Sequence, residues 1–232
     1  MKIKTVTFLG TLLFSSICAN AQKPKLKSEK ISFLGTELNY KITPEALKNG
    51  PIFLTDSKTQ NILVRGFYKN NEPSGTWYFY NPNGLETSYN YDNRKVLFID
   101  TAVLAKNIVS IKSNNKELLE KASVPILLYP KDLFVKTIVD EFTKVKTADS
   151  SEFHIEIVTD FSRPEKINYS VKYFEAGKEK TQPLKFNDLP LEINWVPAMY
   201  IKEFVPSEIR MKISLSGLKF ADDNSKRFRW DN

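Results

Sequence analysis

The chain has 232 residues, of which 41% are hydrophobic and 12% aromatic, and it carries a formal net charge of +7 at pH 7. This composition is typical of a globular protein and excludes a long disordered segment. The lysines and arginines are scattered among acids rather than clustered. This argues against nucleic-acid binding, which needs a focused basic patch.

Residues 1–21 match the pattern of a secretory signal peptide. Two lysines precede an apolar stretch over residues 6–17, and Ala19-Asn20-Ala21 follows as an A-x-A cleavage pattern. The apolar stretch is short for a membrane span, which needs about 20 residues. We therefore expect cleavage after Ala21 and export to the periplasm or to another part of the cell envelope. An uncleaved membrane anchor is the alternative.

Cys18 is the only cysteine of the chain and would leave with this segment. It also offers a third possibility, a lipoprotein, although Ile17 stands where that signal has a small residue. Loss of Lys2 and Lys4 lowers the net charge from +7 to +5. The mature chain would have no disulfide, but about 210 residues are enough to bury a core without one.

Residues 22–100 are predicted to form a β-hairpin region. A short helix is expected within it, in TPEALKNG from Thr43 to Gly50, because Thr43 can cap a helix and Pro44 suits its first turn. From Ile52 to Phe98, apolar segments are separated by turns rich in Asn, Gly, Pro and Ser. This pattern is typical of consecutive antiparallel hairpins.

One hairpin concentrates aromatic residues and glycines, in GFYKNNEPSGTWYFYNPNG from Gly66 to Gly84. Its spacing resembles that of a MORN-variant repeat, G-x-Y-x-N-G-K-x-x-G-x-W-x-x-Y-x-x-N-G, with Asn71 in place of the turn glycine. The flanking sequence is degenerate, since Tyr89 to Lys95 keeps only the start of a second unit. The resemblance implies one unit of a repeat in which aromatic side chains pack neighbouring hairpins.

The period of two along this strand places Trp77 and Phe79 on one face and Tyr78 and Tyr80 on the other. We expect one face to be core and the other to be half exposed, which suits tyrosine. The aromatic residues are interpreted mainly as packing elements. The alternative is an exposed interaction surface of Tyr68, Tyr78 and Tyr80, with Trp77, that stacks on sugar rings or on a partner protein.

Residues 101–122 are interpreted as a partly helical linker, because the segment lacks proline and glycine and NNKELLEKA has a helical composition. A longer helix is expected from Lys131 to Lys146, with Leu133, Ile138 and Phe142 on the face that packs on a sheet.

Residues 123–220 contain the strands of that sheet, and the segment from Pro125 to Phe220 resembles the C-terminal domain of TonB-like proteins. The resemblance rests on the hairpin turn from Asp160 to Val171 and on WVPAMY, from Trp195 to Tyr200, before the final strand. It implies a helix packed on an antiparallel sheet.

The segment departs from the TonB-like pattern in several respects. Pro183 and Pro190 stand where the family has its second helix, and proline inside a helix costs about 3 kcal/mol or more. The hairpin turn lacks its glycine. An uncleaved anchor and a long proline-rich spacer, which an energy transducer needs, are not found. We expect a TonB-like fold without energy transduction.

Residues 221–232 form a basic tail that includes KRFRW, and a solvated tail is favoured over contact with anionic lipid or polysaccharide.

The sequence offers little for catalysis. His154, the only histidine, shares a strand face with Glu156, but two ligands fall short of a usual zinc site. No phosphate-binding glycine loop or nucleophile motif is found. Paired acids such as Asp140 and Glu141 would serve a glycosidase only if two carboxylates faced each other across a cleft. We therefore expect no catalytic residue, no cofactor and no metal.

Taken together, these patterns predict an α+β fold and an exported, non-enzymatic protein of the cell envelope. Its expected partner is another envelope protein or a cell-wall component. A structural scaffold and a hydrolase acting on polysaccharide are the alternatives.

Overall fold

The computed structural model describes residues 26–105, 107–145, 152–163, 166–216 and 228–230. The predicted signal peptide at residues 1–21 and most of the predicted basic tail at residues 221–232 lie outside the described residues.

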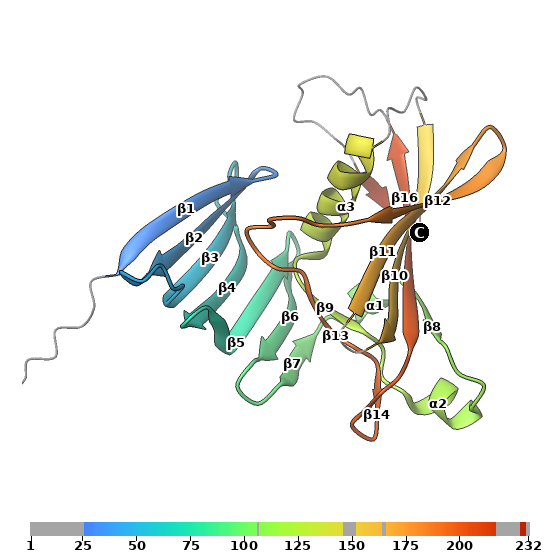
Figure 1. Cartoon of the computed structure of the whole chain (residues 1–232), viewed down its shortest axis with the longest axis horizontal. Helices are drawn as coiled ribbons and strands as arrows, with labels where there is room; N and C mark the ends of the chain where they lie inside the picture. Colours follow the sequence, from blue (N-terminus) through green and yellow to red (C-terminus); the bar gives the residue numbers. More distant parts are fainter. Residues whose placement is uncertain (1–25, 106, 146–151, 164–165, 217–227, 231–232) are drawn as a thin grey trace, which may run out of the picture.

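The N-terminal half forms a seven-stranded antiparallel sheet, here called the N-terminal sheet, in which each strand pairs with its neighbours in chain order (Figure 1). Tight turns join the strands. Asn70 and Asn71, for example, have φ values of 52° and 71°, the left-handed conformation that a type I′ hairpin turn requires. The strands are β1 (Lys27–Phe33), β2 (Thr36–Ile42), β3 (Gly50–Asp56), β4 (Ile62–Lys69), β5 (Glu72–Asn81), β6 (Gly84–Asn90) and β7 (Lys95–Ile99).

The short helix predicted from Thr43 to Gly50 is wrong, because this segment is a turn between β2 and β3. The backbone N–H of Leu47 donates to the Thr43 hydroxyl at 3.3 Å, and a bridge between Ile42 and Lys48 closes the turn. Ala46 has a φ of 62°, outside the helical region. The chain must reverse direction between two paired strands, and the residues that could cap a helix stabilise this reversal instead.

The middle of the chain contains short elements that connect to the C-terminal half. They are α1 (Thr101–Leu104), β8 (Ile108–Ile111), α2 (Lys116–Lys121), β9 (Ile126–Leu128) and α3 (Lys131–Val145). The segment interpreted as a linker thus holds two short helices and one strand. β8 pairs with β16 and is therefore part of a second sheet.

That second sheet, here called the C-terminal sheet, has six strands in the order β12-β11-β10-β16-β17, and β8 lies beside β16. Two small pairs, β13 with β9 and β14 with β15, lie outside it. The strands are β10 (Glu152–Arg163), β11 (Lys166–Glu175), β12 (Lys178–Leu184), β13 (Asn194–Val196), β14 (Met199–Tyr200), β15 (Glu203–Phe204), β16 (Ser207–Ser216) and β17 (Phe228–Trp230).

Helix α3 lies between the two sheets (Figure 1). Phe134 contacts Trp195 and Tyr169 on the C-terminal side, with ring centroids 5.7 and 6.0 Å away. On the other side, the Lys136 ammonium donates a hydrogen bond to the backbone carbonyl of Leu34. The helix is therefore buried on two sides, whereas the sequence predicted one buried face. Buried residues of both halves form one continuous hydrophobic cluster.

The predicted α+β fold class is wrong, because the protein is largely all-β. Of the described residues, 57% are in strands and 13% in helices. The N-terminal half has no helix within its described residues. In the C-terminal half, Lys178–Leu184 is the edge strand β12, near the place where the TonB-like pattern has its second helix. Pro183 is tolerated there because an edge strand leaves one row of N–H groups unpaired.

Candidate functional site

The aromatic hairpin packs into the shared core. Trp77 and Phe79 are only 2% and 1% exposed. The Trp77 ring contacts Tyr68 and Tyr91 edge to face, with centroids 5.1 and 5.5 Å away. Its indole N–H donates to the carbonyl oxygen of Phe67 at 3.2 Å, so the polar atom of this buried side chain is satisfied.

Gly66 of the repeat-like motif is explained by the same ring. A Cβ atom at Gly66 would lie 2.3 Å from a carbon atom of the Trp77 indole, far inside van der Waals contact. The indole lies over the backbone of the neighbouring strand, and only glycine leaves room for it. The Gly–Trp spacing is thus a packing requirement.

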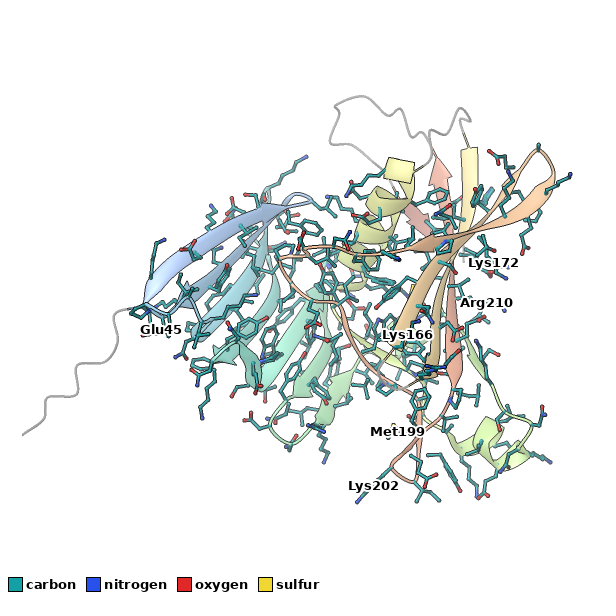
Figure 2. All side chains as sticks on the ribbon, in the orientation of Figure 1. Glu45, Lys166, Lys172, Met199, Lys202 and Arg210 are labelled. Carbon is teal, nitrogen blue, oxygen red and sulfur yellow. The ribbon has the colours of Figure 1, made fainter. Side chains whose placement is uncertain are left out.

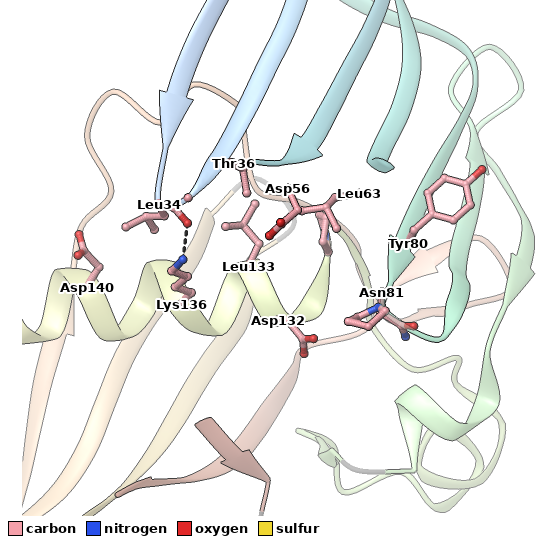
Figure 3. A pocket seen from close by; sticks show the side chains of 13 residues that line it. Leu34, Thr36, Asp56, Leu63, Tyr80, Asn81, Asp132, Leu133, Lys136 and Asp140 are labelled. Atoms are coloured by element: carbon pink, nitrogen blue, oxygen red, sulfur yellow. Dashed lines mark hydrogen bonds between the residues drawn. The ribbon is translucent and has the colours of Figure 1, made fainter. Parts of the chain in front are cut away.

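The structure does not bring the four predicted interaction residues together on one surface. Tyr68 and Trp77 are buried on the face of the N-terminal sheet toward α3, and burial raises the pKa of the Tyr68 hydroxyl to about 12. Tyr78 is half-buried on the opposite face, beneath the Arg65 guanidinium at 4.6 Å from the ring centroid. Tyr80 lies at the end of a groove, with its ring directed away from α3 (Figure 3).

This groove, of about 460 Å³, lies between the N-terminal sheet and α3 (Figure 3). Leu34, Leu63 and Leu133 supply its apolar lining. The turn between β1 and β2, the neighbouring strands and the first three turns of α3 form its walls. Lys136 bridges the groove, since its ammonium donates to the Leu34 carbonyl.

Three aspartates, Asp56, Asp132 and Asp140, also line the groove. The Asp56 carboxylate accepts a hydrogen bond from the backbone N–H of Thr59 at 2.7 Å, which lowers its pKa and keeps it ionised. Asp140 lies 3.2 Å from the Lys144 ammonium. The lining of the groove therefore combines apolar side chains with three carboxylates and one ammonium group, that of Lys136. Such a site suits a ligand that carries a cation on an apolar stem.

His154 and Glu156 lie on the face of the C-terminal sheet that is turned away from α3. Lys172 and Arg210 lie on the same side (Figure 2). His154 Nδ1 is 3.0 Å from the Ser214 hydroxyl. Within the described ranges, no three His, Cys, Asp or Glu side chains gather as a metal site would require. His154, Glu156 and Lys172 line a hollow of about 410 Å³ on this face.

The sequence contains no local signal for the groove. Asp56 ends β3, whereas Asp132 and Asp140 belong to α3, and they line one groove only because α3 packs beside the N-terminal sheet. The sequence had offered Asp140 only as a member of an acidic pair.

Comparison with known proteins adds no identification. No family model matches the chain, and neither a curated protein nor a solved structure matches it. The MORN-variant and TonB-like resemblances therefore stay predictions. Among the residues that the structure describes, no helix is both long enough and apolar enough to cross a membrane.

Proposed function

We propose that the chain is an exported, non-enzymatic binding protein of the cell envelope, and that it holds its partner in the groove between the N-terminal sheet and α3. One observation carries the proposal: an apolar lining and three aspartates share one groove of about 460 Å³. Small-ligand sites commonly span about 300–1,000 Å³ and combine apolar walls with a few placed polar groups. Export rests on the signal-peptide pattern of residues 1–21.

The charge of the groove favours a partner of opposite sign. Its lining carries three aspartates and one cation, Lys136, which acts electrostatically on Asp56, and Asp140 is paired with Lys144 from outside the lining. A lysine- or arginine-bearing segment of another envelope protein would place its alkyl stem against Leu63 and Leu133 and its charge beside Asp132.

A hydrolase acting on envelope polysaccharide is the second candidate, because it needs two carboxylates across a cleft. It also needs one carboxyl group whose pKa is raised, so that the group can donate a proton. Asp56 shows the opposite, a lowered pKa, and Asp140 is paired with Lys144. Both observations favour a binding site over a hydrolase.

The test is crosslinking of the tagged protein in its native envelope, followed by mass spectrometry. We compare wild type with Asp132→Asn/Asp140→Asn, using Glu120→Gln on the exposed surface of α2 as the matched control. Circular dichroism first establishes that each variant is folded. We expect a discrete partner to be lost from the double variant and kept by the control.

An identical set of partners in all three proteins would contradict the proposal. Release of reducing ends from envelope polysaccharide by wild type but not by the double variant would show a hydrolase instead.

A further inference from the structure

The face of the N-terminal sheet opposite the groove carries a continuous row of side chains across six strands. Residues that are directly paired on neighbouring antiparallel strands point to the same face. The pairs follow one another from β2 to β7, and we call their members the outer row: Asn39, Phe53, Arg65, Tyr78, Ser88 and Phe98. The chain neighbours Ile52, Val64 and Trp77 point the other way and are buried.

Aromatic side chains occur at every second strand of this row. Phe53 is on β3, Tyr78 on β5 and Phe98 on β7. Because neighbouring strands lie about 4.8 Å apart, successive rings are about 10 Å apart. This separation is close to the length of two sugar rings in an extended polysaccharide. The strands between carry Arg65 and Ser88, which are polar.

Parts of the row are accessible to a ligand: Arg65 and Phe98 are exposed and Phe53 and Tyr78 are half-buried, whereas Ser88, between Tyr78 and Phe98, is only 4% exposed. Figure 1 shows α3 and the C-terminal sheet on one side of the N-terminal sheet, and no other described element covers the opposite side. Phe98 is 44% exposed, and the adjacent Leu97 is 51% exposed. The register shift between Ser88 and Tyr89 explains this pair, since it inserts an extra residue into β7.

The charge of this face identifies the kind of ligand. By strand register, five cations and two carboxylates of the described strands lie on it: Lys30, Lys41, Arg65, Lys69 and Lys95, with Glu37 and Glu72. Both carboxylates have a lysine beside them, since Glu37 forms an ion pair with Lys30 at 2.7 Å and Glu72 lies opposite Lys69. The face is therefore complementary to a polymer that carries negative charge.

We propose that the outer row binds an extended acidic polysaccharide that runs across the strands. Its sugar rings stack on Phe53, Tyr78 and Phe98, and its carboxylates pair with the Arg65 guanidinium, which can donate two parallel hydrogen bonds. This site is separate from the groove, so its failure would leave the proposed function untouched.

Isothermal titration calorimetry with two probes tests the proposal on the mature protein. The acidic probe is a 1,4-linked mannuronate hexamer, and the neutral probe is cellohexaose. Wild type is expected to bind the acidic hexamer more tightly. Each lost ring is expected to weaken binding by about tenfold, so Tyr78→Ala/Phe98→Ala should bind about a hundredfold more weakly. Arg65→Gln should remove the preference for the acidic probe.

Two control variants make the result specific. Phe174→Ala removes a ring that is 64% exposed on the C-terminal sheet and should leave affinity unchanged. Asp132→Asn/Asp140→Asn alters the groove and should also bind the hexamer like wild type. Failure of wild type to bind either probe would overturn the proposal, as would equal weakening in Phe174→Ala. Equal affinity for the two probes would overturn the assignment to an acidic polymer. If only the groove variant lost affinity for the hexamer, the polysaccharide site would be the groove and the proposal would be wrong.

Discussion

Replacing Glu86 by glutamine is expected to stabilise the protein at pH 8 and to change its stability little near pH 4.5. Glu86 is on β6 and only 3% exposed, and its carboxylate accepts a hydrogen bond from the backbone N–H of Lys131 at the start of α3, at 3.3 Å. Burial raises the pKa of Glu86 to about 7, and the hydrogen bond from Lys131 opposes that rise only in part.

The sign and size of the effect follow from this pKa. Because the pKa in the folded state is above its unfolded value of 4.5, the folded state binds more protons between about pH 4.5 and 7. The contribution of the protonated carboxyl group is present below pH 4.5 and is lost as the pH rises to 7. At about 1.4 kcal/mol per pKa unit, the loss is about 3 kcal/mol. Glutamine does not titrate and keeps an acceptor for Lys131, so we expect a gain of about 1–3 kcal/mol at pH 8.

Urea unfolding followed by tryptophan fluorescence at pH 4.5, 6 and 8 measures this gain. Glu72→Gln, at an exposed acid, should keep the pH dependence of wild type. The reasoning would be refuted if Glu86→Gln were less stable than wild type at pH 8. That result would mean that the carboxylate is ionised and compensates the Lys131 ammonium, which is itself buried and donates to Asn107 at 2.9 Å.

The remaining predictions concern the aromatic hairpin and the N-terminus. Gly66→Ala should destabilise the protein by about 1–3 kcal/mol in urea unfolding, because its Cβ would overlap the Trp77 ring; an unchanged midpoint would contradict that packing. Trp77→Ala should cost about 3–5 kcal/mol, whereas Tyr78→Ala on the opposite face should cost less than half as much, and similar losses would refute the assignment of faces. N-terminal sequencing of the exported protein should begin at Gln22, and an intact Met1 would favour the membrane anchor.

Local patterns in the sequence predicted the elements whose signals are local. Period-two alternation and turn residues indicated the hairpins of the N-terminal half, and the structure has β3 to β7 in that region. The alternation of Trp77 and Phe79 with Tyr78 likewise agrees with their burial. Helix α3, at Lys131–Val145, lies where helical spacing places it. These features depend on steric and periodic rules that act within a few residues.

Predictions that depended on context were less successful. The sequence placed a short helix after Thr43, but pairing of β2 with β3 required a turn there. It also favoured an α+β protein, whereas strands dominate both halves. Propensity for a short helix is a weak preference, and hydrogen bonding to neighbouring strands overrides it.

The sequence by itself determined which residues alternate along the hairpin strands and where the long helix begins, because these properties follow from backbone geometry and spacing. Only the tertiary structure decided what covers each face. It placed Tyr68 in the core with Trp77 and left Tyr78 on the outer face, and it buried α3 between two sheets. It also placed Asp56 in the same groove as Asp132 and Asp140. The hydrophobic effect is not directional, so an apolar pattern shows that a face is buried without showing which segment buries it.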